Sequence, residues 1–168
     1  ASNGSTHHTL EDIALMRSLP NMQVICAGDP LEVRAATNAF FNDPKPTYLR
    51  IGKKGEPCVH DRPLEKFQVG KSICIKRGHS VALLATGNLL SNSSILSDKL
   101  DESGIPSSLY SFHTIKPLDK ECLEEVFRTH DFVVTIEEHG LLGGFGSAVA
   151  EWLAVQTKTK ARLLRIGT

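Results

Sequence analysis

The stretch DFVVTIEEHGLLGGFGSAVAEWLAVQ, residues 131–156, decides the class of fold that we expect. Residues 132–136 form an apolar run rich in β-branched side chains, and two acids follow it, a pattern typical of a buried strand. A glycine-rich turn follows, and the residues after it predict a helix. A buried strand that leads into a helix is the repeating unit of a parallel sheet.

The same alternation extends outward in both directions. Before this stretch, residues 22–28 and 47–52 predict strands, and residues 29–43 predict a helix with Asp29 as N-cap and Pro30 at its first position. Two short strands are expected within 72–87, a helix over 88–103, a strand within 106–119 and a helix from Asp119 to about His130. With a last strand within 161–167, the pattern predicts an α/β fold with a mostly parallel sheet.

The chain divides into unequal parts around a segment rich in proline, glycine and charge, residues 53–72. The part before it has only two predicted strands and two predicted helices, the first of which ends at Pro20, and two strands are too few to bury a core. We therefore expect an incomplete domain over 1–53, a linker over 54–71 and a complete domain over 72–168. This incomplete start, and a first residue that is Ala1 rather than Met, indicate a piece of a longer chain.

Composition excludes several classes of protein. The 168 residues include nineteen basic and nineteen acidic side chains, without long charged blocks, so we expect no nucleic-acid partner and no membrane surface. No apolar run is long enough to span a bilayer, and the start does not resemble a signal peptide. The cysteines are not spaced like a metal or redox motif, which favours reduced thiols in a cytoplasmic protein; they are Cys26, Cys58, Cys74 and Cys122.

Residues 4–36, GSTHHTLEDIALMRSLPNMQVICAGDPLEVRAA, resemble the second half of the pyrimidine-binding domain of the transketolase family. In that family a Gly-Pro-Thr-His segment opens a helix, and a Pro-Asn turn, a strand and a helix with an acid-Pro-x-Glu start follow. The matching residues are Thr6, His7, Glu11, Asp12, Leu19, Pro20, Asn21, Asp29 and Glu32.

Two later segments resemble the C-terminal domain of the same family: HTIKPLD, residues 113–119, and VVTIEEHGLLGGFGSAVAEWLA, residues 133–154. The resemblance implies a three-layer α/β/α C-terminal domain, preceded by the last part of a pyrimidine-binding α/β domain. HTIKPLD favours a transketolase, whereas EEHGLLGGFGSAV favours a deoxyxylulose-phosphate synthase. The β chain of a 2-oxoacid dehydrogenase is a third alternative.

The resemblance implies a transferase that moves a two-carbon ketol unit between sugar phosphates, with thiamine diphosphate and magnesium in the intact enzyme. No segment here matches the glutamate that activates the cofactor or the family's magnesium motif. We therefore expect no cofactor on this chain alone and no activity without a pyrophosphate-binding domain, in cis or on a second subunit. A homodimer is the expected assembly.

The resemblance also implies roles for individual residues. His7 matches the histidine that reaches the substrate channel, so we expect it to be catalytic and to bind substrate. Ser5 replaces the family's proline, and His8 stands where transketolases usually have glutamine. Lys53 aligns best with the residue that holds the substrate phosphate, and Arg50 is its neighbour. Without the resemblance, each of these residues is a polar side chain in an exposed turn or at a strand end.

Other candidates have plainer interpretations. The GGFGS turn, residues 143–147, could offer backbone N–H groups to an anion, although Val149 breaks the G-x-G-x-x-G pattern. Glu137, Glu138 and His139 could form an acid/base cluster, but neighbouring strand residues point to opposite faces, which favours a turn or interface role. His79 and His113 have no evident partner.

One hypothesis belongs to a different class: a noncatalytic α/β module that mediates subunit association. The half sheet that such a module would leave open argues against it. Apolar surface left bare by the incomplete first domain predicts self-association.

Overall fold

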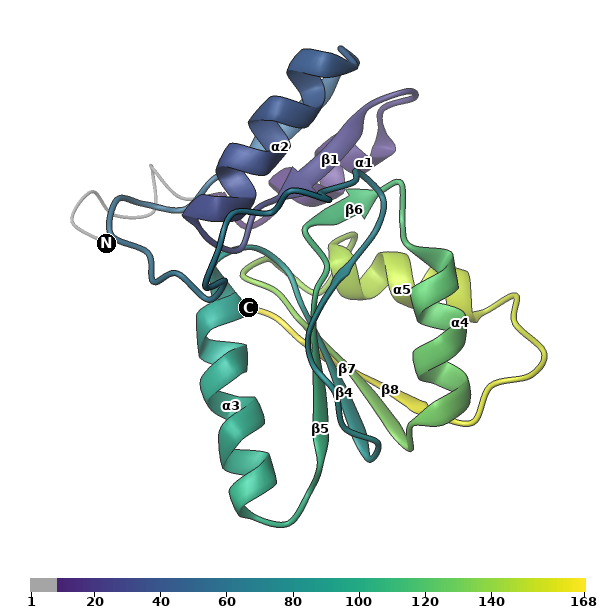
Figure 1. Ribbon diagram of the computed structural model, residues 1–168. Coiled ribbons are helices and arrows are strands. Elements are labelled where there is room, and N and C mark those ends of the chain that lie inside the picture. Colours follow the sequence, from purple (N-terminus) through teal and green to yellow (C-terminus); the bar gives the residue numbers. More distant parts are fainter. Residues whose placement is uncertain (1–8) are drawn as a thin grey trace.

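The computed structural model describes residues 9–168 and forms two sheets (Figure 1). Its helices are α1 (Asp12–Ser18), α2 (Pro30–Asn42), η2 (Gly87–Leu89, a 3₁₀ turn), α3 (Leu90–Glu102), α4 (Lys120–Thr129) and α5 (Phe145–Leu153). Its strands are β1 (Gln23–Cys26), β2 (Thr47–Arg50), β3 (Ile73–Lys76), β4 (Val81–Ala85), β5 (Ser107–Ser111), β6 (Thr114–Lys116), β7 (Phe132–Ile136) and β8 (Arg162–Ile166).

The larger sheet has the strand order β3-β5-β4-β7-β8. Strands β5, β4, β7 and β8 are parallel, and only the edge strand β3 runs antiparallel to its neighbour. Helix α3 covers one face of this sheet, whereas α4 and α5 cover the other (Figure 1). The prediction of a three-layer α/β/α fold with a mostly parallel sheet is confirmed.

Two separate hydrophobic clusters explain these layers. Leu90 of α3 packs with Leu83 and Val134, the side chains on one face of β4 and β7. Phe127 of α4 and Trp152 of α5 pack with the opposite face, in a cluster that extends to Ile13 of α1 and Val24 of β1. Side chains alternate between the two faces of a strand, so each strand supplies both clusters.

The smaller sheet has the order β2-β1-β6, and its third strand comes from late in the sequence. Strand β6 pairs antiparallel with β1, which is parallel to β2. Residues 106–119 therefore contain two strands, β5 and β6, where the sequence predicts one. Because β6 belongs to the smaller sheet, residues on both sides of the linker share this sheet, and the boundaries 1–53, 54–71 and 72–168 stay a prediction.

Residues 51–72 contain no helix or strand, yet the segment is anchored by side chains. His60 places its ring Nδ1 2.8 Å from a carboxylate oxygen of Asp29 at the start of α2. Phe67 stacks on His113, with 4.1 Å between the ring centroids. The predicted linker is therefore packed against the start of α2 and against the connection between β5 and β6.

The predicted helix starts are confirmed by hydrogen bonds. The Asp29 side chain accepts from the backbone N–H groups of Leu31 and Glu32, and Pro30 occupies the first turn. Asp119 accepts from the N–H of Cys122 in the same way. Each aspartate satisfies N–H groups that have no partner inside their helix.

Candidate active site

The carboxyl ends of β1, β2, β4 and β7 lead into one region of the molecule. Arg50, at the end of β2, donates to the backbone oxygen of Glu138, which follows β7. Asn88, which follows β4, donates to the side chain of Glu138 at 2.6 Å. In α/β folds, ligands bind beyond the carboxyl ends of parallel strands, so this region is the candidate active site.

An open cavity of about 250 Å³ lies in this region. Its walls come from the start of α2 and from the segment after β2, and Asn88 closes one side; the residues that line it include Gly28, Pro30, Val33, Gly52, Lys53, Lys54 and Asn88. Lys53 and Lys54 are exposed there. The cavity can therefore offer ammonium groups to an anionic ligand.

The structure separates the two predicted phosphate ligands. Lys53 lines the cavity, whereas the guanidinium group of Arg50 is bound inside the protein. Arg50 Nε lies 3.0 Å from the carboxylate of Asp12, which also accepts from the Tyr48 hydroxyl at 2.6 Å. The other nitrogens of Arg50 donate to backbone oxygens of Glu138 and Thr9. Lys53 is therefore the better placed of the two for a ligand in this cavity.

His7 and His8 lie outside the described residues 9–168, so their predicted roles stay predictions. The described chain starts at Thr9, whose backbone oxygen accepts from Arg50 Nη2 at 3.1 Å. The chain leading out of segment 1–8 is thus attached to the end of β2.

The glycine turn before α5 does bind an anion, and that anion belongs to the protein itself. The buried carboxylate of Glu137 accepts from the backbone N–H groups of Phe145 and Gly146, at 2.6 and 2.7 Å. Burial raises the pKa of Glu137, and these two hydrogen bonds oppose that rise. The N–H groups predicted to face an anion are therefore already occupied.

Glu137 and His139 lie close together, with 4.0 Å between Glu137 Oε2 and His139 Nδ1, whereas Glu138 has a different partner. Glu137 binds the start of α5, and Glu138 accepts from Asn88. His139 is fully buried, and its two nitrogens lie near the Gly140 oxygen and the Ala14 N–H. All three residues lie directly after β7, where Glu137 and Glu138 hold the start of α5 and Asn88; an interface role stays a prediction.

A buried group that the sequence analysis missed joins the linker to α2. His60 contacts Asp29 through Nδ1, and its Nε2 lies 3.6 Å from Glu32 Oε1. The other Glu32 oxygen accepts from the Gly28 N–H at 2.6 Å. Burial raises the pKa of Glu32. Burial also acts to raise the pKa of Asp29, but the hydrogen bonds from His60 and Glu32 outweigh this effect, so the pKa of Asp29 is lowered. The sequence near Asp29 and Glu32 predicts a helix start, but nothing in it indicates that His60 is their partner.

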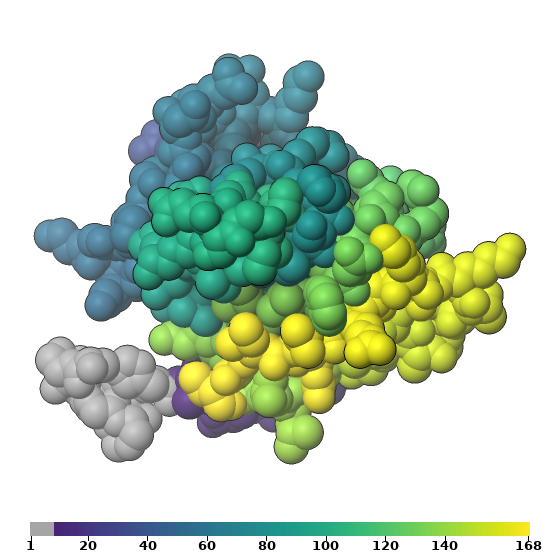
Figure 2. All heavy atoms as spheres, turned by 90° about the horizontal axis from the view of Figure 1, so that it is seen from below, coloured from purple at the N-terminus to yellow at the C-terminus, as the bar shows by residue number. Residues whose placement is uncertain are grey.

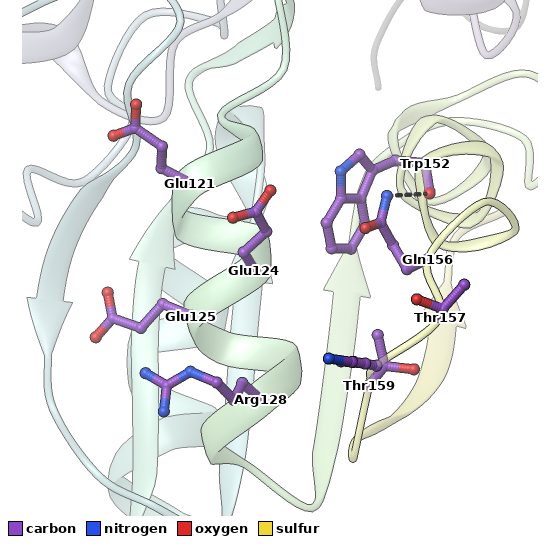
Figure 3. Close-up of a pocket in the computed structure, with 9 residues that line it drawn as sticks. Glu121, Glu124, Glu125, Arg128, Trp152, Gln156, Thr157 and Thr159 are labelled. Atoms are coloured by element: carbon purple, nitrogen blue, oxygen red, sulfur yellow. Dashed lines mark hydrogen bonds between the residues drawn. The ribbon is translucent and has the colours of Figure 1, made fainter.

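A second, larger cavity of about 540 Å³ lies away from the strand ends, between α4 and the segment that joins α5 to β8 (Figure 3). Glu124 faces Trp152 across it, and Gln156 donates to the backbone oxygen of Trp152 at 3.1 Å. Of the described residues predicted for the site, neither Arg50 nor Lys53 lines this cavity.

The family-implied cofactor can be tested against the residues present. Within residues 9–168, no group of three or more His, Cys, Asp and Glu side chains could hold a metal ion. The described residues alone therefore do not supply a ligand set for magnesium. Over the same residues, no helix is long and apolar enough to cross a membrane.

The fold and the cavity define an α/β protein with a site beyond the carboxyl ends of parallel strands. Sequence comparison goes further: residues 70–168 match the family described as transketolase, C-terminal domain, and residues 1–56 match transketolase, pyrimidine binding domain. The chain belongs to the transketolase family.

Individual relatives support this assignment. A Methanocaldococcus jannaschii protein, provisionally named as a transketolase C-terminal section, is 34% identical over 98% of this chain and 51% of its own length. The 1-deoxy-D-xylulose-5-phosphate synthase of Haemophilus influenzae is 36% identical over 99% of this chain and 26% of its own length. A solved structure described as a split gene transketolase, inactive beta4 tetramer, superposes with a TM-score of 0.90 at 35% identity, over 98% of this chain and 54% of that one. The chain thus spans about half the length, or less, of these relatives.

Proposed function

We propose that this chain supplies the pyrimidine-binding and C-terminal parts of a thiamine-diphosphate-dependent transketolase, which moves a two-carbon ketol unit between sugar phosphates. The observation that carries the proposal is its match to both domain families in sequence order, together with the 0.90 TM-score against a split gene transketolase. One of the subunits of the apulose-4-phosphate transketolase of Phocaeicola vulgatus, 30% identical over 90% of this chain and 48% of its own length, is a second relative of the split kind.

In this proposal the chain works with a pyrophosphate-binding domain on a second subunit. Thiamine diphosphate supplies the carbanion chemistry when it is bound in the complete enzyme. In this proposal the second subunit provides the diphosphate and magnesium ligands. Two such pairs of subunits would form the expected dimer. The chain alone would be inactive; the tetramer of the split gene relative is likewise described as inactive.

Two residues of this chain have proposed roles at the substrate. Lys53 lines the cavity at the strand ends, where its ammonium group would attract the substrate phosphate. His7, two positions before Thr9, would donate to or accept from substrate oxygens, which suits imidazole near neutral pH. Arg50 would act indirectly, since it holds Asp12 and Thr9.

A deoxyxylulose-phosphate synthase is the second candidate, favoured by the 36% identity to the Haemophilus influenzae enzyme. That enzyme class condenses pyruvate with glyceraldehyde phosphate. The discriminating assay mixes this chain with its partner subunit and thiamine diphosphate. It offers either a ketose phosphate with an aldose phosphate, or pyruvate with glyceraldehyde phosphate. Product only from the first mixture supports transketolase, and product only from the second overturns it in favour of the synthase.

The noncatalytic module is the third candidate. It would bind the partner subunit without contributing to turnover, so His7→Ala would leave the rate of the assembled enzyme unchanged. The transketolase proposal expects that variant to lose at least about 100-fold in kcat/KM, within the range for a lost proton-transfer group.

A further inference from the structure

We propose that His139 anchors helix α1, by capping its first turn from the turn after β7, and that this anchor supports turnover in the assembled enzyme. The inference rests on the proposed function for its catalytic consequence. The contact itself joins residues 125 positions apart, from the turn after β7 to the first turn of α1.

His139 has the hydrogen-bond pattern of a helix cap. Its ring is fully buried, and Nδ1 lies 2.7 Å from the backbone oxygen of Gly140. That oxygen can only accept, so Nδ1 carries the proton and Nε2 is left as an acceptor. Nε2 then accepts from the backbone N–H of Ala14 at 3.3 Å.

Helix α1 has no cap of its own. The residue at its N-cap position, Glu11, makes no side-chain hydrogen bond to the first turn. A free N–H group at a buried helix start costs free energy unless something accepts from it. His139 supplies that acceptor, which explains why an imidazole is buried at this turn.

Further contacts from the same turn hold α1 at both ends. The Gly140 N–H donates to the Leu10 oxygen at 2.7 Å, and Arg17 donates to the oxygens of Gly143 and Gly144 at 2.6 and 3.2 Å. A Cβ on Gly143 would lie 2.6 Å from Ala14 Cβ, so the turn and the helix are closely packed. In Figure 2 the purple atoms that follow the grey segment lie against yellow and yellow-green atoms of the C-terminal part.

These contacts give the C-terminal domain a part in the reaction. His7 is only two positions before Thr9, and the oxygens of Thr9 and Leu10 are bound by Arg50 and Gly140. A loss of the His139 cap would free the first turn of α1 and loosen the contacts of Thr9 and Leu10 just before it. A displacement of about 1 Å at a reacting group can reduce turnover about 100-fold.

The test compares His139→Ala, His139→Gln and His130→Ala in the full chain assembled with its partner subunit. His130 is a matched control, since it is also buried in the C-terminal domain and hydrogen-bonded, to Ser108. We expect His139→Ala to speed amide hydrogen exchange in residues 9–18 and to lower kcat by about 10- to 100-fold at nearly constant KM. A glutamine side chain can donate to Gly140 and accept from Ala14, so His139→Gln should restore most of the exchange protection and most of kcat. His130→Ala should leave exchange in residues 9–18 unchanged.

Two results would overturn the inference: unchanged exchange in residues 9–18 of His139→Ala, or an equal loss of kcat in His130→Ala. If His139→Ala does not fold, Arg17→Ala removes the contacts to Gly143 and Gly144 and is expected to speed the same exchange. A wild-type assembly without ketol transfer would overturn the proposed function and the catalytic part of this inference. The exchange data would still decide whether His139 anchors α1.

Discussion

Gly144 leaves the space that the carboxylate of Glu137 occupies. A Cβ placed on Gly144 would lie 2.2 Å from Glu137 Oε2 and 2.7 Å from His139 Nδ1. The glycine is therefore required by close approach, since its side of the turn is filled by a carboxylate that binds the start of α5. The glycine-rich turn before α5 therefore binds the Glu137 carboxylate of the same chain.

The first prediction concerns this close approach. Gly144→Ala should lower the free energy of unfolding by about 3 kcal/mol, because the methyl group forces Glu137 away from the N–H groups of α5. Chemical denaturation of the variant and the wild type measures this difference in the free energy of unfolding. Gly52→Ala is the control, since its methyl group would meet only the side chain of Glu56. Equal stability of the two variants would contradict the claim that Gly144 is required by the close approach of Glu137.

The second prediction concerns the linker. His60→Ala should lower the free energy of unfolding by about 2 kcal/mol, because buried Asp29 loses its imidazole partner. The exposed His79, changed to Ala, serves as the control. Limited proteolysis should then cut within residues 53–72 of His60→Ala faster than in the control. Identical cleavage rates would show that the linker is not held by this contact.

The third prediction concerns pH. Burial lowers the pKa of His113 from its ordinary value of 6.5 to about 4 in the folded protein. Below pH 6.5 the unfolded chain takes up a proton that folded His113 does not, so its contribution to stability falls by up to about 3 kcal/mol as pH decreases to 4. The buried Glu32 and Glu137 act in the opposite direction, since their pKa values are raised.

A variant isolates the contribution of His113. His113→Phe keeps a ring against Phe67 but cannot titrate. Denaturation at a series of pH values should show that the variant loses less stability than the wild type between pH 6.5 and 4. Parallel curves over that range would contradict the assigned pKa.

The fourth prediction concerns the cavity at the strand ends. Lys53→Ala should raise KM for a phosphorylated substrate about 10-fold with little change in kcat, because an ammonium group would contact the phosphate in both ground and transition states. Lys120→Ala, exposed at the start of α4, is the control. The effect should weaken at high ionic strength. An unchanged KM in Lys53→Ala would remove Lys53 from the proposed site.

Most of the fold could be predicted because its signals are local. The strand–helix alternation, the Asp29 and Asp119 caps and the glycine turn before α5 all appear within a few neighbouring residues. Strand β6 could not be separated from β5, since the break at His113 is made by pairing with β1, far away in sequence. Periodicity reports the local conformation of a strand but not its partner.

The candidate site was harder to predict for the same reason. Only the family resemblance singles out Lys53, which lines the cavity; its role at a substrate stays a prediction. The contacts of His60 with Asp29 and of His139 with Ala14 join residues 31 and 125 positions apart, and isolated histidines in a turn or linker carry no sign of such partners. The same applies to Arg50, whose ion pair with Asp12 depends on how α1 lies against β2.

The measurement that tests the central claim most directly is an assay of ketol transfer. It uses the full chain assembled with the subunit that carries the pyrophosphate-binding domain, with and without thiamine diphosphate and magnesium. We predict transfer of a two-carbon unit from a ketose phosphate to an aldose phosphate only when both subunits and the cofactor are present, and its loss in His7→Ala. A complex that assembles and binds the cofactor, yet transfers no two-carbon unit, would contradict the proposal.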